Sequence, residues 1–531
     1  MTMGKIQLLG GVAALALAVS AGTAFAQDAT GDLAARVQAL EDKAAADHAR
    51  LSTLEQNFNY ASWTYDNGRP VFSTGDGRFS MAFRLRFQSD FAGFSQDATH
   101  ATGFAGPSDL SSGADVRRAY FGVEGKVYND WWYEFRLNGG GSDGGSFGAS
   151  GVPNGGEGDP LVNKAVITYT GIVNTHFNFG VIEPSFMMEG TTSSKDLTWL
   201  ERPEIENIAA DAFGAGDSRR GIEIGWSQTD TLWPGDNLAF DVAFTGGKTG
   251  SAQNHGSAAA TASPAGAGDE NTQLLGRAVE RLWTNGLSNI QIGGSAAHVF
   301  YSGSNGNVDG GTQTLRFRDR PEIRVDGTRL VDTGAINAKT GTMYAGDFEG
   351  NLDNIYFEAE YAHFEMDRQC GSLVATNNPR CTSSSAVIDH PSFEGYTVGA
   401  SWILTGETKT YSASGLAETQ AGFGAPVPSR PFSLSGGSWG AWEVAARYSD
   451  TNLNWMQGQA AVTNTAGTSV LAGVFGGDER VLALGLNWYP NRNIRLMIDD
   501  NIITVKKGVF GNTNRDGQSI NALGIRVQFA N

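Results

Sequence analysis

Beyond its first 26 residues, the chain lacks any apolar run that approaches the roughly 18 residues of a transmembrane helix. We therefore expect no helical membrane anchor in the mature protein. Basic residues are also scarce, with 38 Lys and Arg against 56 Asp and Glu, which gives a formal net charge of −18. Because nucleic-acid binding depends on concentrated Lys and Arg, no nucleic-acid partner is expected.

Cysteine is limited to Cys370 and Cys381, at the two ends of the polar stretch CGSLVATNNPRC. In an oxidising compartment such a pair favours a disulfide that closes a loop, and free thiols are the alternative. The seven histidines show no spacing typical of a metal site, and HFEMD (363–367) does not match the zinc-protease helix motif. The sequence therefore predicts no metal, no cofactor and no enzymatic activity.

The N-terminus has the pattern of an export signal. Lys5 is followed by the apolar stretch LLGGVAALALAV and by the small residues AFA at 24–26. This order is typical of a secretory signal peptide, and we expect cleavage after Ala26. Loss of Lys5 leaves 37 basic against 56 acidic residues, a net charge of −19.

The composition is rich in glycine and aromatic residues. The 71 glycines are nearly twice the usual share of roughly 7%, and aromatic residues make up 10% of the chain. Charged residues make up only 18%. Many short strands joined by turns have this composition.

From residue 78 onward the apolar pattern has a period of two residues. In the stretch FSMAFRLRFQ (79–88) the large apolar side chains are at odd-numbered positions, and Arg84 and Arg86 are at even-numbered positions, so the two sets lie on opposite faces of a strand. We call each such set a parity. The final stretch NALGIRVQF (521–529) alternates in the same way and ends at Phe529. A soluble β-sandwich would bury the apolar parity. A transmembrane barrel instead turns it toward lipid and the polar parity toward a wet lumen.

The barrel is favoured over the sandwich. More than 400 residues of strand-and-turn pattern without a domain break are too many for one sandwich. Small residues such as Gly122 and Ala239 lie on the polar parity, and aromatic residues such as Trp131 and Trp488 lie on the apolar parity near strand ends. We predict an all-β fold, a transmembrane antiparallel β-barrel of an outer membrane, preceded by a short helix.

Residues 31–58 follow a different pattern, with alternating spacings of four and three residues that are typical of a coiled coil. The positions are Leu33, Val37, Leu40, Ala44, Asp47, Leu51, Leu54 and Phe58. A lone amphipathic helix on the body of the protein is the alternative. The predicted domains are a signal peptide (1–26), a periplasmic coiled-coil helix (27–60) and the barrel (61–531).

Several motifs, taken in their order and spacing, resemble the phosphate-selective porin O/P family. They are RRAYFGVEGKVYNDWWYEFRL (117–137), WLERPEIE (199–206), RPEIRVDGTRLVDTG (320–334), ILTGETKTY (403–411), GAWEVAARYS (440–449) and GLNWYPNRNIRLM (485–497). The resemblance covers nearly all of the chain beyond residue 78. It implies sixteen strands, a homotrimer in the outer-membrane lipid of a Gram-negative bacterium, and passive diffusion of small anions such as phosphate or polyphosphate.

In that family, arginines along the pore wall and basic residues at a constriction bind the anion. Seven arginines on the lumen parity of this chain are predicted to line the pore and bind anions: Arg84, Arg86, Arg118, Arg136, Arg447, Arg495 and Arg526. Arg84 and Arg86 are the leading pair, because residues i and i+2 of a strand lie on the same wall. The alternative is that both are paired with lumen carboxylates such as Glu124.

Two other functions stay open at this point. The acidic balance is compatible with a general porin of weak or cation selectivity, because pore selectivity depends on local charge. The coiled coil could instead make the protein an envelope tether that contacts peptidoglycan, with the barrel as its anchor.

Residues 187–217 lack a sustained period of two and are too many for a hairpin turn. We predict that this stretch folds into the lumen and narrows the pore, and an external loop is the alternative. Its acidic residues outnumber Lys195 and Arg202 and would oppose the pore arginines. They are Glu189, Asp196, Glu201, Glu204, Glu206 and Asp211.

Overall fold

The computed structural model describes thirteen segments of the chain. They are residues 27–59, 62–66, 68–96, 110–141, 162–248, 270–302, 314–370, 387–413, 418–457, 462–463, 469–470, 473–508 and 517–531. The chain divides into two units, of which one contains the N-terminal helix α1 (Gln27–Asn59) and the other the strands of a barrel.

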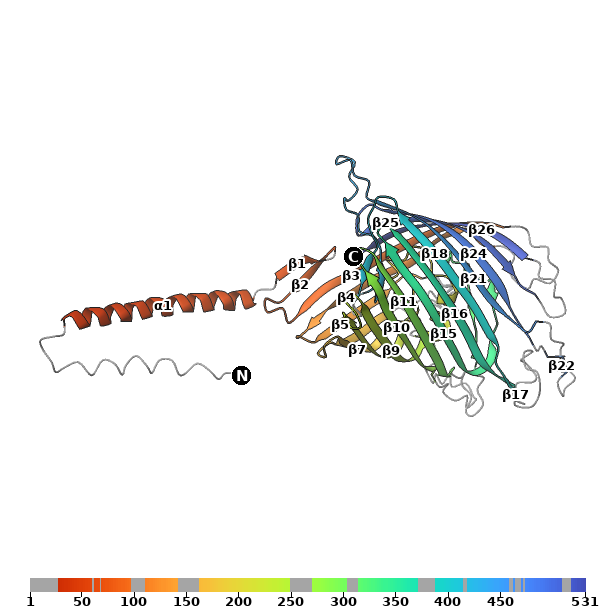
Figure 1. Ribbon diagram of the computed structural model, residues 1–531, viewed down its shortest axis with the longest axis horizontal. Helices are drawn as coiled ribbons and strands as arrows, with labels where there is room; N and C mark the ends of the chain where they lie inside the picture. Colours follow the sequence, from red (N-terminus) through yellow and green to blue (C-terminus); the bar gives the residue numbers. More distant parts are fainter. Residues whose placement is uncertain are drawn as a thin grey trace, which may run out of the picture. The chain divides into compact units, whose positions relative to one another are not determined.

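Within the described residues, sixteen antiparallel strands form the barrel wall (Figure 1). They are β3 (Ser80–Gln96), β4 (Gly113–Val127), β5 (Trp131–Asn138), β6 (Val162–Tyr169), β7 (Thr175–Ile182), β8 (Arg219–Thr229), β9 (Asn237–Lys248), β10 (Thr272–Thr284), β11 (Asn289–Tyr301), β15 (Ile336–Leu352), β16 (Ile355–Cys370), β18 (Ser392–Ile403), β21 (Ala441–Trp455), β24 (Val474–Tyr489), β25 (Ile494–Lys506) and β26 (Gly517–Ala530). The last strand pairs with the first, Phe529 opposite Phe87, so the sheet closes on itself. The prediction of a closed antiparallel barrel is confirmed.

The remaining elements are short strands and one further helix. They are β1 (Ser62–Asp66), β2 (Arg69–Ser73), β12 (Thr314–Leu315), β13 (Arg318–Asp319), β14 (Val331–Asp332), β17 (Val387–Asp389), β19 (Thr410–Ser412), β20 (Gly422–Gly424), β22 (Val462–Thr463), β23 (Ser469–Val470) and α2 (Glu204–Phe213). Among the described helices, neither is long and apolar enough to cross a membrane.

The alternation along the wall strands follows the predicted parity except at register shifts such as the one between β3 and β4. On β3 and β26, Phe87 and Leu523 are 45% and 48% exposed on the outer face, whereas Gln88 and Arg526 are fully buried inside. Since side chains alternate across a strand, this places the apolar parity outside and the polar parity inside. The outer face is therefore apolar. The interior carries polar and charged side chains together with buried apolar ones such as Phe364 and Met366, which belong to one cluster with Phe213 of α2.

Helix α1 covers nearly all of the predicted coiled-coil segment. Its apolar positions Val37, Leu40 and Leu51 are 45%, 66% and 59% exposed. The helix itself agrees with the pattern, and its pairing with another helix stays a prediction.

The predicted disulfide lies outside the described residues. Cys370 ends β16, but its side chain is not described, and Cys381 falls in the undescribed stretch 371–386.

Candidate functional site: the barrel interior

Three connections between wall strands fold into the barrel, two from one end and one from the other. We call residues 183–218, between β7 and β8, the inner loop, and residues 316–335, between β11 and β15, the second inner loop. Both fold in from the barrel end that carries the long connections. Residues 404–440, between β18 and β21, leave the opposite end, where short turns join the strands and the C-terminus lies. We call this stretch, without the undescribed residues 414–417, the turn segment.

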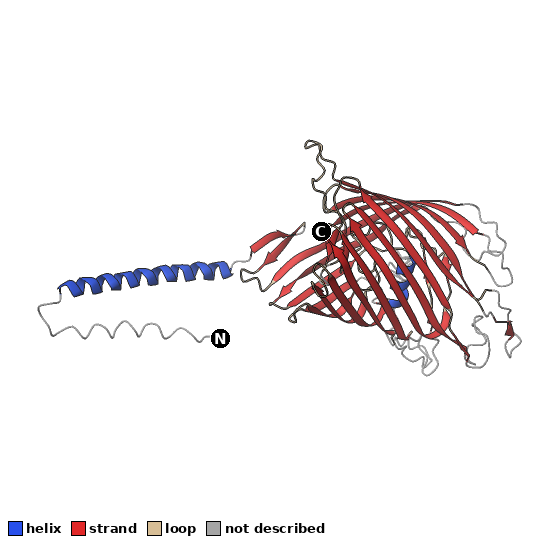
Figure 2. Ribbon diagram, viewed as in Figure 1, coloured by secondary structure: helices blue, strands red, loops and turns tan. Residues whose placement is uncertain are grey.

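The inner loop fills much of the lumen, as predicted. Its helix α2 appears inside the ring of strands in Figure 2, and Phe186, Ile208 and Phe213 are fully buried. Gly214 ends the helix at φ +84, a left-handed conformation that favours glycine. The end of this short helix therefore has a local cause in the sequence.

Glu201 anchors the inner loop to the wall and to the second inner loop. Its carboxylate accepts hydrogen bonds from Arg117 of β4 at 2.7 Å and Arg526 of β26 at 2.8 Å, and lies 3.3 Å from Arg324 of the second inner loop. Burial alone would raise the pKa of the Glu201 carboxyl, but these arginines outweigh burial and hold the pKa well below its usual range. Trp199 adds an apolar contact and donates Nε1–H to Glu358 at 3.1 Å.

All seven predicted arginines point into the barrel, but they have two different roles. Arg447 and Arg526 are at most 1% exposed, line neither of the two cavities described below, and pair with carboxylates of the two inner loops. Arg447, for example, pairs with Glu189 at 3.0 Å and with Glu322 at 2.6 Å. The other five line open space in the lumen: Arg84, Arg86, Arg118, Arg136 and Arg495.

A loop-side cavity lies toward the end with the long connections. Its basic lining residues are Arg86, Arg117, Arg118, Arg136, Lys164, Arg202, Arg324 and Arg329. Its acidic lining residues are Glu183, Asp211, Asp217 and Glu418. Eight basic groups thus face four acidic ones, and the space is locally cationic although the chain is acidic.

A turn-side cavity lies toward the opposite end, near the C-terminus. Its basic lining residues are Arg69, Arg84, Lys195, Arg492 and Arg495, and its acidic side chains are Asp196 and Glu418. Both cavities therefore present an excess of positive groups to the lumen, and Glu418 lies on the boundary between them.

Arg84 and Arg86 are paired with carboxylates, which was the alternative considered for them. Arg84 contacts Glu124 on the neighbouring strand, and both arginines contact Glu418 of the turn segment at 2.8–2.9 Å. Arg86 also donates to the hydroxyl of Ser193 at 2.9 Å. The carboxylate that joins them comes from a part of the chain more than 300 residues away.

Several basic residues of the two cavities were not predicted from the sequence. Arg117 lies next to the predicted Arg118, and both are buried, because the register between β3 and β4 shifts at Gln88 and Ser89. A β-bulge of this kind breaks the simple alternation of faces. The alternation of apolar and polar residues in the sequence does not indicate that the turn segment folds into the barrel or that Glu418 lies in the lumen.

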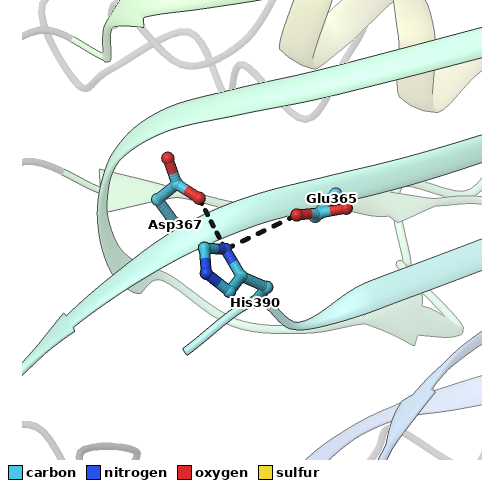
Figure 3. A group of neighbouring side chains, drawn as sticks. All are labelled: Glu365, Asp367 and His390. Atoms are coloured by element: carbon cyan, nitrogen blue, oxygen red, sulfur yellow. Dashed lines mark hydrogen bonds and ion pairs between the residues drawn. The ribbon is translucent and has the colours of Figure 1, made fainter. Parts of the chain in front are cut away.

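A separate group of metal-ligand side chains lies on the outer face, near the long-connection end of β16. The imidazole Nδ1 of His390 is 2.8 Å from Asp367 and 3.5 Å from Glu365 (Figure 3). The three side chains are close enough to share one cation. All three are at least 40% exposed, and the His390 contacts with the two carboxylates account for their proximity without an ion.

Comparison with known proteins is consistent with this interior. The family model for phosphate-selective porin O and P matches residues 81–530. Porin O of Pseudomonas aeruginosa is 25% identical over 441 residues, covering 80% of this chain and 83% of that protein.

Solved structures with a similar arrangement of strands include two bacterial proteins. An anion-selective porin from Comamonas acidovorans is 13% identical at a TM-score of 0.42, covering 85% of this chain and 100% of that one. The trimer form of OmpT, an outer-membrane protein of Vibrio cholerae, is 10% identical at a TM-score of 0.41, covering 85% and 99%.

Proposed function

The chain belongs to the phosphate-selective porin O and P family, and from that premise we propose that its barrel lets small phosphate-like anions diffuse passively through the lumen. The protein is an anion porin in the outer membrane of a Gram-negative bacterium. The selection of phosphate or polyphosphate among anions is the proposed part.

The observation that supports this proposal is the charge of the loop-side cavity, where eight basic groups face four acidic ones. A narrow channel with low-dielectric walls focuses the field of such groups on a permeating ion. Arginine is also suited to phosphate, because its planar fork offers two parallel N–H donors. The same excess of positive charge argues against the alternative of a cation-selective pore.

The proposal is tested by reversal potentials of the reconstituted protein in planar bilayers under KCl and potassium phosphate gradients. We expect anion preference, which falls about twofold in Arg118→Gln, because a unit charge about 8 Å from an ion contributes roughly 0.5 kcal/mol at a water-like dielectric constant of about 80. Arg118 suits this test, since it lines the loop-side cavity and donates to the neutral Gln88 at 2.8 Å.

The matched control is Arg480→Gln, which removes the same charge from the outer face, where Arg480 is exposed. We expect selectivity close to that of the original protein for this variant. Cation preference in the original protein would contradict the proposal and favour the alternative of a cation-selective general porin.

Helix α1 supports a second proposed role, the assembly of three chains. Leu40 and Leu51 are more than half exposed in the single chain, and apolar residues repeated at this spacing favour burial against other helices. Trimers should then appear as conductance steps in groups of three. A tether role toward peptidoglycan predicts instead that deletion of residues 31–58 leaves trimers intact and loosens the cell envelope.

A further inference from the structure

The carboxylate of Glu418 lies where the two cavities meet. Of all the described residues, it is the one that lines both the loop-side and the turn-side cavity. One oxygen is 2.8 Å from Nη2 of Arg86, and the other is 2.9 Å from Nη1 of Arg84 and 2.8 Å from Nζ of Lys195. Three cations from two different parts of the chain thus surround one carboxylate.

Residues of the inner loop and of the turn segment lie on both sides of Glu418 and line one cavity or the other. Residues 191–194 of the inner loop line the loop-side cavity, and Lys195 and Asp196 line the turn-side cavity. Residues 419–420 of the turn segment bond to this stretch: Gln420 N–H donates to Thr191 O at 3.1 Å, and Thr419 Oγ1 donates to Asp196 at 3.0 Å. The connections that enter from opposite ends of the barrel therefore meet here.

The surroundings of Glu418 have the chemistry of an anion-binding site. Guanidinium and ammonium donors at 2.8–2.9 Å are the partners that free carboxylates and phosphates take in proteins. Burial alone would raise the pKa of the Glu418 carboxyl, but Arg84, Lys195 and Arg86 outweigh it and hold the pKa well below its usual range. The side chain therefore stays an anion at physiological pH.

We propose that Glu418 is a tethered anion that closes the passage between the two cavities, and that a permeating carboxylate or phosphate displaces it from Arg84, Arg86 and Lys195. This inference rests on the proposed function, because it concerns the same anion path. Displacement of the Glu418 carboxylate requires no movement of the barrel strands. A rotamer change of the glutamate side chain moves its carboxylate into the turn-side cavity, which it already lines.

A tethered competitor raises the concentration of free anion needed to occupy the site. In Glu418→Gln, the amide lacks the charge that holds the three cations, so the site is open to the permeating ion. We expect the apparent dissociation constant of inorganic phosphate, measured as its block of the chloride current, to fall about tenfold, which corresponds to about 1.4 kcal/mol. We also expect higher conductance at low salt.

Two further variants make the result interpretable. Glu407→Gln makes the same change in the same turn segment at a residue that lines neither cavity and bonds to Ser429. It should keep the phosphate constant of the original protein. Glu418→Asp keeps the charge on a side chain that is one methylene shorter. It should lower the dissociation constant of phosphate by a smaller factor than Glu418→Gln, and it provides the test if Glu418→Gln does not fold.

Each outcome supports or overturns a specific statement. A lower phosphate constant in Glu418→Gln or Glu418→Asp, with no change in Glu407→Gln, supports the tethered anion. An anion-selective channel whose phosphate constant is the same in all variants overturns the inference and leaves the proposed function standing. Cation selectivity of the original protein overturns the proposed function itself.

Discussion

Removal of the charge on Glu201 should release the inner loop from the barrel wall. In Glu201→Gln the side chain keeps its shape, but its amide can no longer compensate the buried Arg117 and Arg526 or the partly buried Arg324. Removing one partner of a buried ion pair costs about 3–5 kcal/mol, because the remaining charge is left uncompensated. The inner loop should therefore open locally far more often.

Hydrogen exchange measures this opening directly. If local opening limits exchange of the amides of residues 186–216, a loss of about 3–5 kcal/mol speeds their exchange by roughly 10² to 10⁴. Exchange of the β21 and β24 peptides should change little. Since the pKa of Glu201 is lowered, its stabilising effect is complete above the ordinary carboxyl range and is lost only as the pH falls through the depressed pKa.

The matched control is Glu407→Gln, which changes a partly buried carboxylate of the turn segment. That carboxylate accepts hydrogen bonds from the hydroxyls of Thr405 and Ser429 and from the backbone N–H of Ser429. This variant should leave exchange of the inner loop unchanged. Wild-type exchange rates of residues 186–216 in Glu201→Gln would refute the idea that this one carboxylate anchors the loop.

Two other substitutions test the buried acids and the N-terminal helix. Glu204 is fully buried, neither of its carboxylate oxygens accepts a hydrogen bond from another described residue, and burial, together with Glu322 and Glu479, raises its pKa well above the usual range. A raised carboxyl pKa lowers stability as pH increases toward it, so Glu204→Gln should raise the melting temperature at pH 8 more than at pH 5; a lower melting temperature at pH 8 would contradict this. Leu40→Ala or Leu51→Ala should weaken trimers in sedimentation experiments, because each buried leucine contributes roughly 2–5 kcal/mol; unchanged trimers would count against helix pairing.

The wall of the barrel could be predicted from the sequence because its determinant is local. A period of two fixes which face each side chain takes, so the inward direction of Arg84 and Arg526 followed from their parity alone. The inner loop was also predictable, since 187–217 breaks the period and is too long for a turn. The family resemblance supplied the number of strands, which no local pattern contains.

The partners of the inward arginines could not be predicted, because they come from distant parts of the chain. Arg526 pairs with Asp90 and with Glu201, which lie 436 and 325 residues away. Parity cannot distinguish an arginine used in this way from one such as Arg118 that lines open space. The inward position of Arg117 depends on a register shift, which is a property of two strands together.

The net charge of −18 is a poor guide to the ion that this lumen admits. At physiological ionic strength the Debye length is about 8 Å, so acidic groups on the outer surface are largely screened from an ion inside the barrel. Many of the carboxylates that do lie inside, such as Glu201, are neutralised by arginines that hold the loops. The ion therefore responds to the groups around the open space. Eight basic groups line the loop-side cavity against four acidic ones, and two of the eight, Arg117 and Arg324, are already paired with Glu201 behind the lining. One of the four acidic groups is Glu418, and we propose that the permeating anion displaces its carboxylate.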